Sequence, residues 1–250
     1  MKILISGHNG FVGKHLLRKL KYLKLSHEID FLTKSDFQSL SNLVNKISPD
    51  DIIFHLAGVN RDVNEEEVYK KNNEINELLY SALEDIQFKG KLLFTSSTQE
   101  ESETLYGKAK KNARLKFIEQ SSSLNYLFYG IITPNIFGPF CKPNYNSVVA
   151  TFCHNIANDL PIKVHEPSVK LQLVYVDDVV TKFIDTFQLG STGLSWETVE
   201  PEYSITLGEL ADQINTFNKS RYNLISERVG TGFVRALYST YVSYLPREKF

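Results

Sequence analysis

The fold of this chain is decided by the stretch Lys2-Ile3-Leu4-Ile5-Ser6-Gly7-His8-Asn9-Gly10-Phe11-Val12-Gly13. The short apolar run predicts a strand, the glycines predict a tight turn, and the amphipathic residues that follow predict a helix. Gly7 permits the turn, Gly10 lets a pyrophosphate approach the backbone, and Gly13 lets the helix pack close to the sheet. The helix N-terminus adds unpaired N–H groups and a positive dipole end. The stretch therefore predicts a dinucleotide-binding loop, and the alternative is a glycine-rich turn that binds nothing.

Strands and helices alternate after this stretch. Further strands are predicted at 29–32, 51–58 (with a loop), 91–97 and 126–132, and further helices at 37–47, 65–83 and 106–119. Such alternation predicts an α/β fold with a doubly wound parallel sheet of the Rossmann type, covered by helices on both faces.

The second half of the chain is less regular. Glycine, proline and asparagine interrupt the apolar segments from residue 134 to about 171, and residues 174–178 are predicted to return to the sheet. We expect one unit over 1–250. In it, 1–133 form mainly a nucleotide-binding lobe, 134–250 form mainly a smaller discontinuous substrate lobe, and 172–187 return to the first lobe.

The composition excludes several classes of protein. The chain has 250 residues, 42% of them hydrophobic and 23% charged, with a net charge of −1. These values are ordinary for a globular protein and lack the basic excess of a general nucleic-acid or acidic-membrane binder. No apolar run reaches membrane-helix length, and no signal peptide is expected. The two cysteines, Cys141 and Cys153, form no CxxC motif, so neither a disulfide framework nor a zinc site is predicted and a cytoplasmic location is favoured.

The end of the second predicted strand bears on cofactor choice. Folds of this kind that prefer NAD carry Asp or Glu there, to hold the ribose 2′-hydroxyl. This chain has Leu32-Thr33-Lys34 instead. Lys34 can pair with a 2′-phosphate, which favours NADP, or it is a solvated loop lysine. Asp36 can accept a hydrogen bond from the adenine amino group, or it caps the next helix.

A hydroxyl, a phenol and an ammonium are predicted to meet at the carboxyl end of the sheet. Ser97 ends a strand, and Tyr106 and Lys110 lie on one face of the helix that follows. The YxxxK pattern alone is weak, so its position carries the information. We expect Lys110 and an oxidised nicotinamide to lower the pKa of Tyr106, so that the phenol exchanges a proton with a carbonyl or alcohol while Ser97 donates to the oxygen. The alternative is three unrelated surface or strand-end side chains.

These features together resemble the extended short-chain dehydrogenase/reductases that act on nucleotide sugars. The resemblance includes His55-Leu56-Ala57-Gly58 on the third strand, Asn72 on a helix, the turn Thr133-Pro134-Asn135-Ile136-Phe137-Gly138-Pro139 and the segment Val176-Asp177-Asp178. It implies that Lys110 also holds the nicotinamide ribose and that Asn135 lies near the substrate. It further implies a homodimer that pairs through the helix containing Tyr106 and Lys110. Ile132 departs from the pattern, because many relatives have an arginine there.

A narrower resemblance is to the reductase part of the bifunctional capsular polysaccharide enzymes of the N-acetyl-L-fucosamine pathway. It is carried by residues 57–61, 94–99 and 237–241 and above all by the run from Cys141 to Cys153. It implies NADPH-dependent reduction of the C4 ketone of a UDP-2-acetamido-2,6-dideoxy-hexos-4-ulose to a UDP-2-acetamido-2,6-dideoxy-L-talose, for capsule or O-antigen (lipopolysaccharide) synthesis. In that family a zinc-containing cupin domain follows and epimerises C3 first. The resemblance leaves open whether that domain has been truncated or is a separate chain.

The expected site residues follow from these motifs. The catalytic set is Ser97, Tyr106 and Lys110, with Thr98 as the alternative hydroxyl. Cofactor contacts are expected from Gly7, Asn9, Gly10, Phe11, Val12, Gly13, Lys34, Asp36, Leu56, Ala57, Gly58, Tyr106 and Lys110. Substrate contacts are expected from Asn60, Arg61, Ser97, Thr98, Asn135, Lys142, Asn146 and Ser147. No metal site is expected, and Arg221, Arg228 and Arg235 stay open as partners of the diphosphate.

Two other functions compete with reduction. One is a 4-epimerase or 4,6-dehydratase that retains and regenerates NAD. A dehydratase usually has an Asp-Glu pair after the strand-end hydroxyl, whereas Thr98-Gln99 stands here. The other is a non-catalytic NADPH sensor, against which the set of Ser97, Tyr106 and Lys110 argues.

Overall fold

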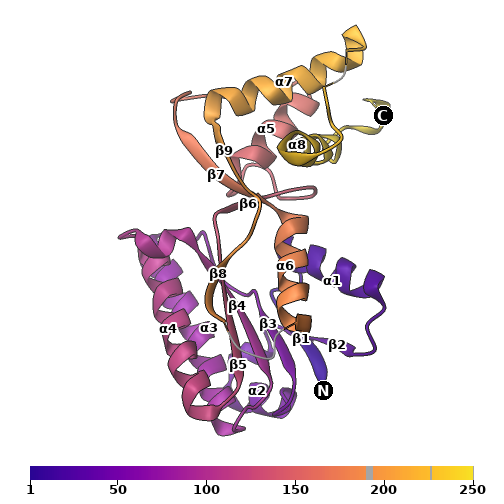
Figure 1. Cartoon of the computed structure of the whole chain (residues 1–250). Coiled ribbons are helices and arrows are strands. Elements are labelled where there is room, and N and C mark those ends of the chain that lie inside the picture. The colour runs from indigo at the N-terminus through magenta and orange to yellow at the C-terminus, as the bar shows by residue number, and fades with distance from the viewer. Residues whose placement is uncertain (190–193, 226, 250) are drawn as a thin grey trace. The chain divides into compact units, whose positions relative to one another are not determined.

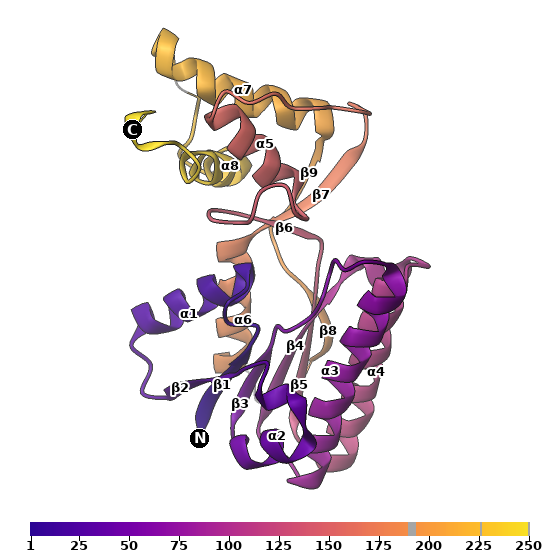
Figure 2. The same ribbon diagram turned by 180° about the vertical axis from the view of Figure 1, so that it is seen from behind.

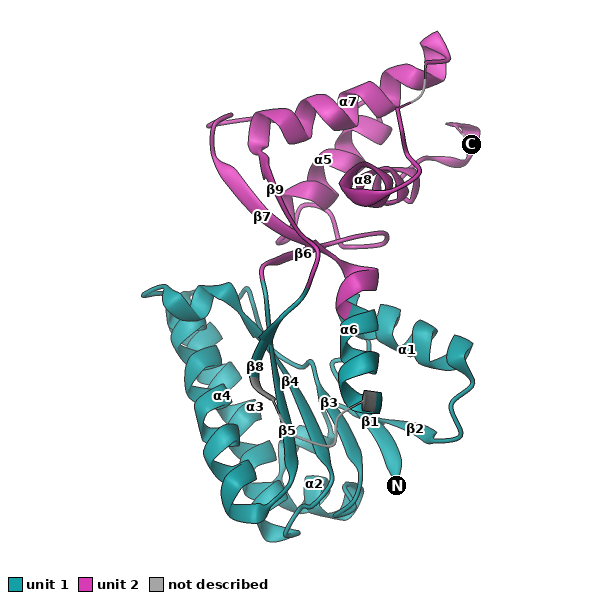
Figure 3. Ribbon diagram, viewed as in Figure 1, with its two compact units in different colours: residues 1–133, 180–199 teal, residues 134–179, 200–250 magenta. Residues whose placement is uncertain are grey.

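The chain divides into two compact units. The computed structural model describes residues 1–189, 194–225 and 227–249, so residues 190–193, 226 and 250 of the predicted lobes lie outside the described residues. Unit 1 consists of residues 1–133 and 180–199, and unit 2 of residues 134–179 and 200–250 (Figure 3).

Unit 1 is built on a six-stranded sheet whose paired strands all run parallel, in the order β2-β1-β3-β4-β5-β8. The strands are β1 (Lys2–Ser6), β2 (Glu28–Leu32), β3 (Ile52–His55), β4 (Lys91–Ser97), β5 (Leu127–Thr133) and β8 (Leu194–Thr198). The chain adds β2 on one side of β1 and then β3 on the other, so the strand order reverses at β1. Ligands of open parallel sheets bind at such a reversal, outside the carboxyl ends of the strands. The predicted doubly wound α/β sheet of the Rossmann type is confirmed.

Helices cover both faces of this sheet. Those of unit 1 are α1 (Phe11–Leu23), α2 (Leu40–Lys46), α3 (Glu65–Asp85), α4 (Leu105–Leu124) and the part of α6 (Val176–Leu189) that starts at residue 180, together with the 3-10 turns η1 (Asp36–Gln38) and η2 (Thr98–Glu101). Helices α2, α3 and α4 pack on one face, and α1 and α6 lie on the other (Figures 1 and 2).

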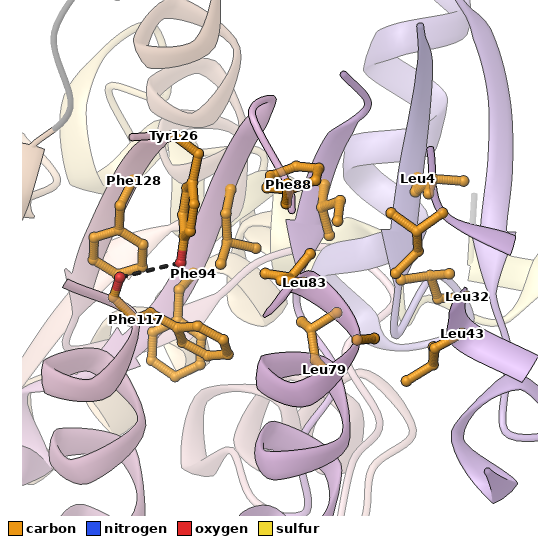
Figure 4. Close-up of a cluster of buried hydrophobic side chains, with 14 of the residues drawn as sticks. Leu4, Leu32, Leu43, Leu79, Leu83, Phe88, Phe94, Phe117, Tyr126 and Phe128 are labelled. Atoms are coloured by element: carbon orange, nitrogen blue, oxygen red, sulfur yellow. Dashed lines mark hydrogen bonds between the residues drawn. The ribbon is translucent and has the colours of Figure 1, made fainter. Parts of the chain in front are cut away.

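The largest core of unit 1 lies between the sheet and the layer of α2, α3 and α4 (Figure 4). Phe94 of β4, Phe128 of β5 and Phe117 of α4 are buried in it. The hydroxyl of Tyr126 donates to the Phe117 carbonyl oxygen at 3.1 Å, so the phenol is buried with its polar end satisfied. This core fixes where β4 and α4 end, and both elements carry predicted site residues.

Side-chain caps set several helix ends. Asn64 accepts from the Glu67 N–H at 2.8 Å and begins α3, and Thr104 accepts from the Gly107 N–H at 3.2 Å and begins α4. The predicted helix over 37–47 is divided, because Ser39 is extended and caps α2 by accepting from the Asn42 N–H. Residues 36–38 form the separate turn η1.

Unit 2 contains a second sheet and three helices. Strand β6 (Asn135–Phe137) pairs parallel with β7 (Lys170–Tyr175), which pairs antiparallel with β9 (Glu202–Thr206). The helices are α5 (Val148–Ala157), α7 (Leu207–Asn223) and α8 (Gly232–Val242), followed by the turn η3 (Arg247–Lys249). Tyr241 of α8 is buried against Phe217 of α7, so the aromatic residues near the C-terminus belong to the core of unit 2.

One boundary differs from its prediction. Residues 172–187 were expected to return to the first lobe, but β7 joins the sheet of unit 2 and the return begins at residue 180. The apolar run Leu173-Val174-Tyr175-Val176 is buried, and burial alone does not distinguish a strand of one sheet from a strand of the other. Among the described residues, no helix is both long and apolar enough to cross a membrane.

Candidate functional site

The glycine-rich loop between β1 and α1 is shaped by close backbone contacts. Gly7 has a φ of +70°, and a Cβ there would stand 2.9 Å from the backbone nitrogen of Ala57. A Cβ on Gly13 would stand 2.3 Å from the carbonyl oxygen of Gly7. Both positions therefore require glycine, whereas a Cβ on Gly10 would meet only the Gly7 oxygen, at 3.1 Å.

The first turn of α1 lacks a side-chain cap. Its N-cap residue is Gly10, which makes no side-chain capping bond, and the first turn holds no acidic residue. The N–H groups of a first turn have no partner within the helix, and they favour an anion. Asn9 and Gly10 are exposed beside this turn, and Phe11 and Val12 are half-buried within it.

A buried hydrogen-bonded chain, here called the neutral network, fixes the loop after β3. The Ser6 hydroxyl accepts from the N–H groups of Leu56 at 3.1 Å and Ala57 at 3.0 Å, and it contacts His55 Nδ1 at 2.8 Å. A hydroxyl has two lone pairs and one proton, so Ser6 donates that proton to Nδ1. His55 Nε2 then carries the ring proton and donates it to Asn76 Oδ1, 3.0 Å away.

Two asparagines of α3 complete the neutral network, which consists of Ser6, His55, Asn76 and Asn72. Asn76 Nδ2 donates to the Asn72 carbonyl oxygen at 2.7 Å. The Asn72 side chain accepts from the Val59 N–H at 3.1 Å and donates to the Val59 oxygen at 2.6 Å. The network therefore ties the loop from Leu56 to Val59 to β1 and α3.

His55 is neutral in this setting. Burial, with a smaller contribution from the nearby Lys110 charge, lowers the pKa of His55 to about 3. The loop is thus held by uncharged hydrogen bonds at neutral pH.

The end of β2 presents the two predicted determinants of cofactor choice. Lys34 is exposed. The Asp36 carboxylate accepts from the Thr33 N–H and the Thr33 hydroxyl, both at 2.6 Å. Asp36 therefore caps neither helix, because Ser35 precedes η1 and Ser39 precedes α2. The alternative in which Asp36 caps a helix does not hold, because its carboxylate closes the turn that leads away from β2.

The predicted reacting groups lie on β4, η2 and α4. Ser97 is the last residue of β4, and its hydroxyl accepts from the Gln99 N–H at 3.2 Å, which leaves the hydroxyl proton to be donated. Thr98 is exposed at the start of η2. A Cβ on Gly107 would stand 2.0 Å from the Gln99 carbonyl oxygen, so α4 touches η2 one residue after Tyr106.

Lys110 is buried against the strands. Its Nζ donates to the Thr95 carbonyl oxygen at 3.0 Å and lies 4.9 Å from the centre of the Phe94 ring. A Cβ on Gly58 would stand 3.3 Å from Nζ, so the loop after β3 meets α4 here. Burial lowers the pKa of Lys110 to about 8, and the negative charge of Glu100 opposes that shift.

The pKa of Tyr106 differs from its prediction. Burial raises it above the ordinary value, and no neighbouring charge offsets this effect. The expectation that Lys110 lowers the pKa is therefore not met by these protein groups alone, since desolvation disfavours the phenolate. Tyr106 is a protonated phenol at neutral pH and is suited to donate a proton.

The groups gathered in unit 1 fit a dinucleotide. The tight backbone turn at Gly7 and Gly13, the first turn of α1 without a side-chain cap and the fixed loop from Leu56 to Gly58 all lie at the reversal of strand order. This arrangement suits a pyrophosphate at the glycines and a nicotinamide ribose beside Lys110.

The remaining predicted substrate residues divide between the units. Asn60 and Arg61 are exposed in unit 1 after the loop that the neutral network holds. Asn135, Lys142, Asn146 and Ser147 lie in unit 2. Lys142 Nζ lies 5.2 Å from the centre of the Tyr145 ring, and the Ser147 hydroxyl accepts from the Ala150 N–H at 3.2 Å as the cap of α5.

The three open arginines also lie in unit 2. Arg221 donates to the Lys249 carbonyl oxygen at 2.6 Å, and Arg235 lies 5.7 Å from the centre of the Tyr175 ring. Arg228 is exposed. Within the residues that the structure describes, no group of three or more His, Cys, Asp or Glu side chains is suited to hold a metal ion.

A second buried polar cluster was missed by sequence reasoning. We call Ser96, Glu100 and Arg114 the charged network. Arg114 Nε lies 3.0 Å from both carboxylate oxygens of Glu100, Arg114 Nη2 donates to Oε2 at 2.8 Å, and the Ser96 hydroxyl donates to Oε1. The available signal was spacing, because Arg114 follows Lys110 by four residues and continues the face of Tyr106.

Comparison with known proteins places the chain among relatives. A model of the NAD dependent epimerase/dehydratase family matches residues 3–193. The chain is 41% identical, over 253 aligned residues, to the UDP-2-acetamido-2,6-beta-L-arabino-hexul-4-ose reductase of Pseudomonas aeruginosa. That alignment covers 100% of this chain and 66% of the relative, so the chain spans about two thirds of the relative's length.

Solved structures agree with this placement. The capsular polysaccharide assembling protein CapF of Staphylococcus aureus is similar with a TM-score of 0.81 and 32% identity, over 99% of this chain and 66% of that one. UDP-glucose 4-epimerase of Thermus thermophilus, solved with NAD, has a TM-score of 0.79 and 15% identity, over 98% of this chain and 99% of that one. At such low identity the second likeness concerns the fold alone.

Proposed function

The chain belongs to the NAD dependent epimerase/dehydratase family, and from that membership we propose that it is an NADPH-dependent reductase of a UDP-linked 4-keto sugar. The observation that carries the proposal is the 41% identity, over the whole chain, to a reductase of a UDP-linked hexul-4-ose. The proposed substrate is a UDP-2-acetamido-2,6-dideoxy-hexos-4-ulose. The proposed product is the corresponding L-talose derivative, made in the cytoplasm for capsule or lipopolysaccharide synthesis.

The proposed mechanism assigns one role to each reacting side chain. When bound, the reduced nicotinamide supplies the hydride that adds to C4 of the sugar. Tyr106, a phenol whose pKa is raised by burial, gives its proton to the oxygen on C4 as the carbonyl becomes an alcohol. Ser97 donates its hydroxyl proton to the same oxygen and stabilises the negative charge that develops there.

Lys110 is held against the strand that ends in Ser97. Its Nζ is anchored on the Thr95 carbonyl oxygen two residues before Ser97. The remaining protons of that ammonium are suited to the hydroxyls of the nicotinamide ribose.

Binding of the cofactor and sugar nucleotide is assigned to the predicted residues. Gly7, Gly10, Gly13 and the first turn of α1 take the pyrophosphate, and Leu56 to Gly58 line the cofactor. Lys34 takes the 2′-phosphate that distinguishes NADP. Asn60 and Arg61 in unit 1, and Asn135, Lys142, Asn146 and Ser147 in unit 2, are proposed to bind the sugar nucleotide. We further propose a homodimer that pairs through α4, and a separate or appended cupin epimerase that prepares the substrate.

An NAD-retaining 4-epimerase is the alternative, and membership of the NAD dependent epimerase/dehydratase family is what favours it. The two functions differ in turnover, because a reductase consumes one reduced cofactor per sugar and an epimerase consumes none. NAD that stays bound through purification would support the alternative.

The test is to mix the full chain with NADPH and a UDP-4-keto-6-deoxy-N-acetylhexosamine, with and without a separate cupin epimerase, and to follow NADPH absorbance. Substrate-dependent oxidation is expected, falling about 10²- to 10⁴-fold in Tyr106→Phe while NADPH binding persists. Tyr22→Phe, at a side chain 80% exposed, is the matched control and should react as wild type. NADPH binding without oxidation in either mixture would reject the proposal.

A further inference from the structure

The charged network continues the reacting face of α4. Tyr106, Lys110 and Arg114 follow one another at intervals of four residues and so share one side of the helix. Arg114 is only 7% exposed and Glu100 only 3% exposed, which is unusual for charged side chains. Two buried ions, one of them on the helix that carries the proposed proton donor, call for an explanation.

Stability alone is a weak explanation. Taking two charges out of water costs several kcal/mol per ion, and apolar side chains of similar volume often stabilise a core equally well. The bidentate geometry of Glu100 and Arg114 offsets much of that cost but gives little advantage over an apolar pair. A role in the neighbouring site accounts for a charged pair at this place.

The contacts of Glu100 join the three elements that carry the reacting groups. Glu100 belongs to η2, the turn that Ser97 begins. Its carboxylate accepts from Ser96 at the end of β4 and from Arg114 on α4. Beside it, Gly107 packs on the Gln99 oxygen, so η2 is clamped to α4 at two points.

The surroundings of Lys110 identify Glu100 as its acidic neighbour. From β3, His55 faces it as an uncharged ring, and from β4 the Thr95 oxygen and the Phe94 ring contact it. From η2 comes the Glu100 carboxylate, whose charge favours the ammonium form. On α4 itself the neighbours along the face are Tyr106 and the cationic Arg114.

We propose that Glu100 and Arg114 are positioning residues of the reacting site, which tie the end of β4 and η2 to α4 and so hold Ser97 in register with Tyr106 and Lys110. Glu100 supplies the negative charge that favours the Lys110 ammonium, and Arg114 fixes where the carboxylate points. This inference rests on the proposed reductase function for its kinetic readout, but not for its effect on Lys110.

The test compares Glu100→Gln with Glu101→Gln in the full chain. Glu101 lies on the same turn, its side chain is 83% exposed, and its contact with Lys111 is 3.9 Å long, so it is the matched control. With lysines labelled at ¹³Cε, the Lys110 signal, assigned by its loss in Lys110→Arg, is titrated by NMR. We expect the pKa of Lys110 to fall in Glu100→Gln and to stay unchanged in Glu101→Gln.

The kinetic readout separates positioning from simple folding. In Glu100→Gln, kcat is expected to fall about 10- to 100-fold with little change in the KM for NADPH, because a small misplacement of the reacting groups is costly. The alkaline limb of the pH profile should move to lower pH, following Lys110. Glu100→Asp, which restores the charge, should recover part of both effects.

A second variant covers failure to fold, because Glu100→Gln leaves Arg114 buried without its anion. Glu100→Gln/Arg114→Met removes both charges and should fold, yet still show the lowered kcat, because no carboxylate then ties η2 to α4. A folded double variant with the wild-type kcat would overturn the inference. If wild type turns over no keto sugar, the proposed function fails, while the NMR titration still decides the role of Glu100.

Discussion

Two buried polar networks lie at the carboxyl end of the same sheet, and they differ in charge. The neutral network holds the loop after β3 through hydrogen bonds between uncharged side chains. The charged network holds η2 against α4 through an ion pair. Lys110 is coupled to both networks. Its positive charge contributes to the lowered pKa of His55, and the negative charge of Glu100 opposes the lowering of the pKa of Lys110 by burial.

The difference separates two tasks. A loop that receives a cofactor has to keep one backbone conformation. Hydrogen bonds between uncharged groups hold that conformation without adding a net charge to the site. Groups that move a proton need a defined local charge, and a buried ion pair supplies one because low dielectric strengthens it. Four measurements test this difference between the two networks.

The largest effect is expected from Arg114→Met, which leaves the Glu100 carboxylate buried without its cation. Such a change costs about 3–5 kcal/mol in the free energy of unfolding, measured by urea denaturation. The control is Lys111→Met, at a cation on α4 whose side chain is 44% exposed, which should leave the unfolding curve unchanged. If Arg114→Met and wild type were equally stable, water would have to reach the Glu100 carboxylate and solvate it.

Ser6→Ala is the corresponding break in the neutral network. It leaves two backbone N–H groups and His55 Nδ1 without their partner, at a cost of about 1–3 kcal/mol in the free energy of unfolding. Weaker cofactor binding should accompany it, because the loop from Leu56 to Gly58 loses its anchor. The exposed hydroxyl of Ser41 gives the control Ser41→Ala. If Ser6→Ala is less stable but binds the cofactor as tightly as wild type does, the neutral network does not support the cofactor site.

Acid should weaken the neutral network through His55. Its pKa is about 3 in the folded chain and near 6.5 when exposed, so the unfolded chain binds the extra proton between these values. Stability is therefore lost as pH falls from about 6.5 towards 3, by at most roughly 1.4 kcal/mol per pH unit. The pH dependence of unfolding should be shallower in His55→Gln. Parallel curves would show that His55 titrates normally in the fold.

The smallest effect is expected outside both networks, at Lys34. Because this side chain is exposed, Lys34→Ala should raise the Kd for NADPH by less than about tenfold and leave the Kd for NADH unchanged. Lys19→Ala, at another exposed lysine, is the control. If Lys34→Ala changed the Kd for NADPH and the Kd for NADH equally, Lys34 would not determine the choice between the two cofactors.

Local patterns made most of unit 1 predictable. Strands 2–6 and 91–97 have the predicted bounds, because each apolar run is closed by glycine or by hydroxyl residues. Helix 37–47 was divided by Ser39, a residue that caps helices as readily as it sits on their surface. The return predicted over 172–187 starts at residue 180 instead of 172, because the pairing of β7 depends on partners far along the chain.

The candidate site was predictable where backbone chemistry dictates the residue type. Glycines at a turn and a Tyr-Lys pair at one helical spacing follow from local geometry. The pairing of Glu100 with Arg114 spans 14 residues and joins two charges of a kind usually found in water. Their burial depends on how η2 folds onto α4, which no local pattern of charges reveals.

The contact between Gly107 and the Gln99 oxygen also has a consequence for redesign. Any side chain at position 107 would overlap a backbone atom, which cannot swing aside as a side chain can. A library that varies the segment between Ser97 and Tyr106 therefore has to keep this glycine and the turn beneath it as one invariant block. New specificity would have to be sought at an exposed position outside that turn, such as Glu103, where substitution leaves the block intact.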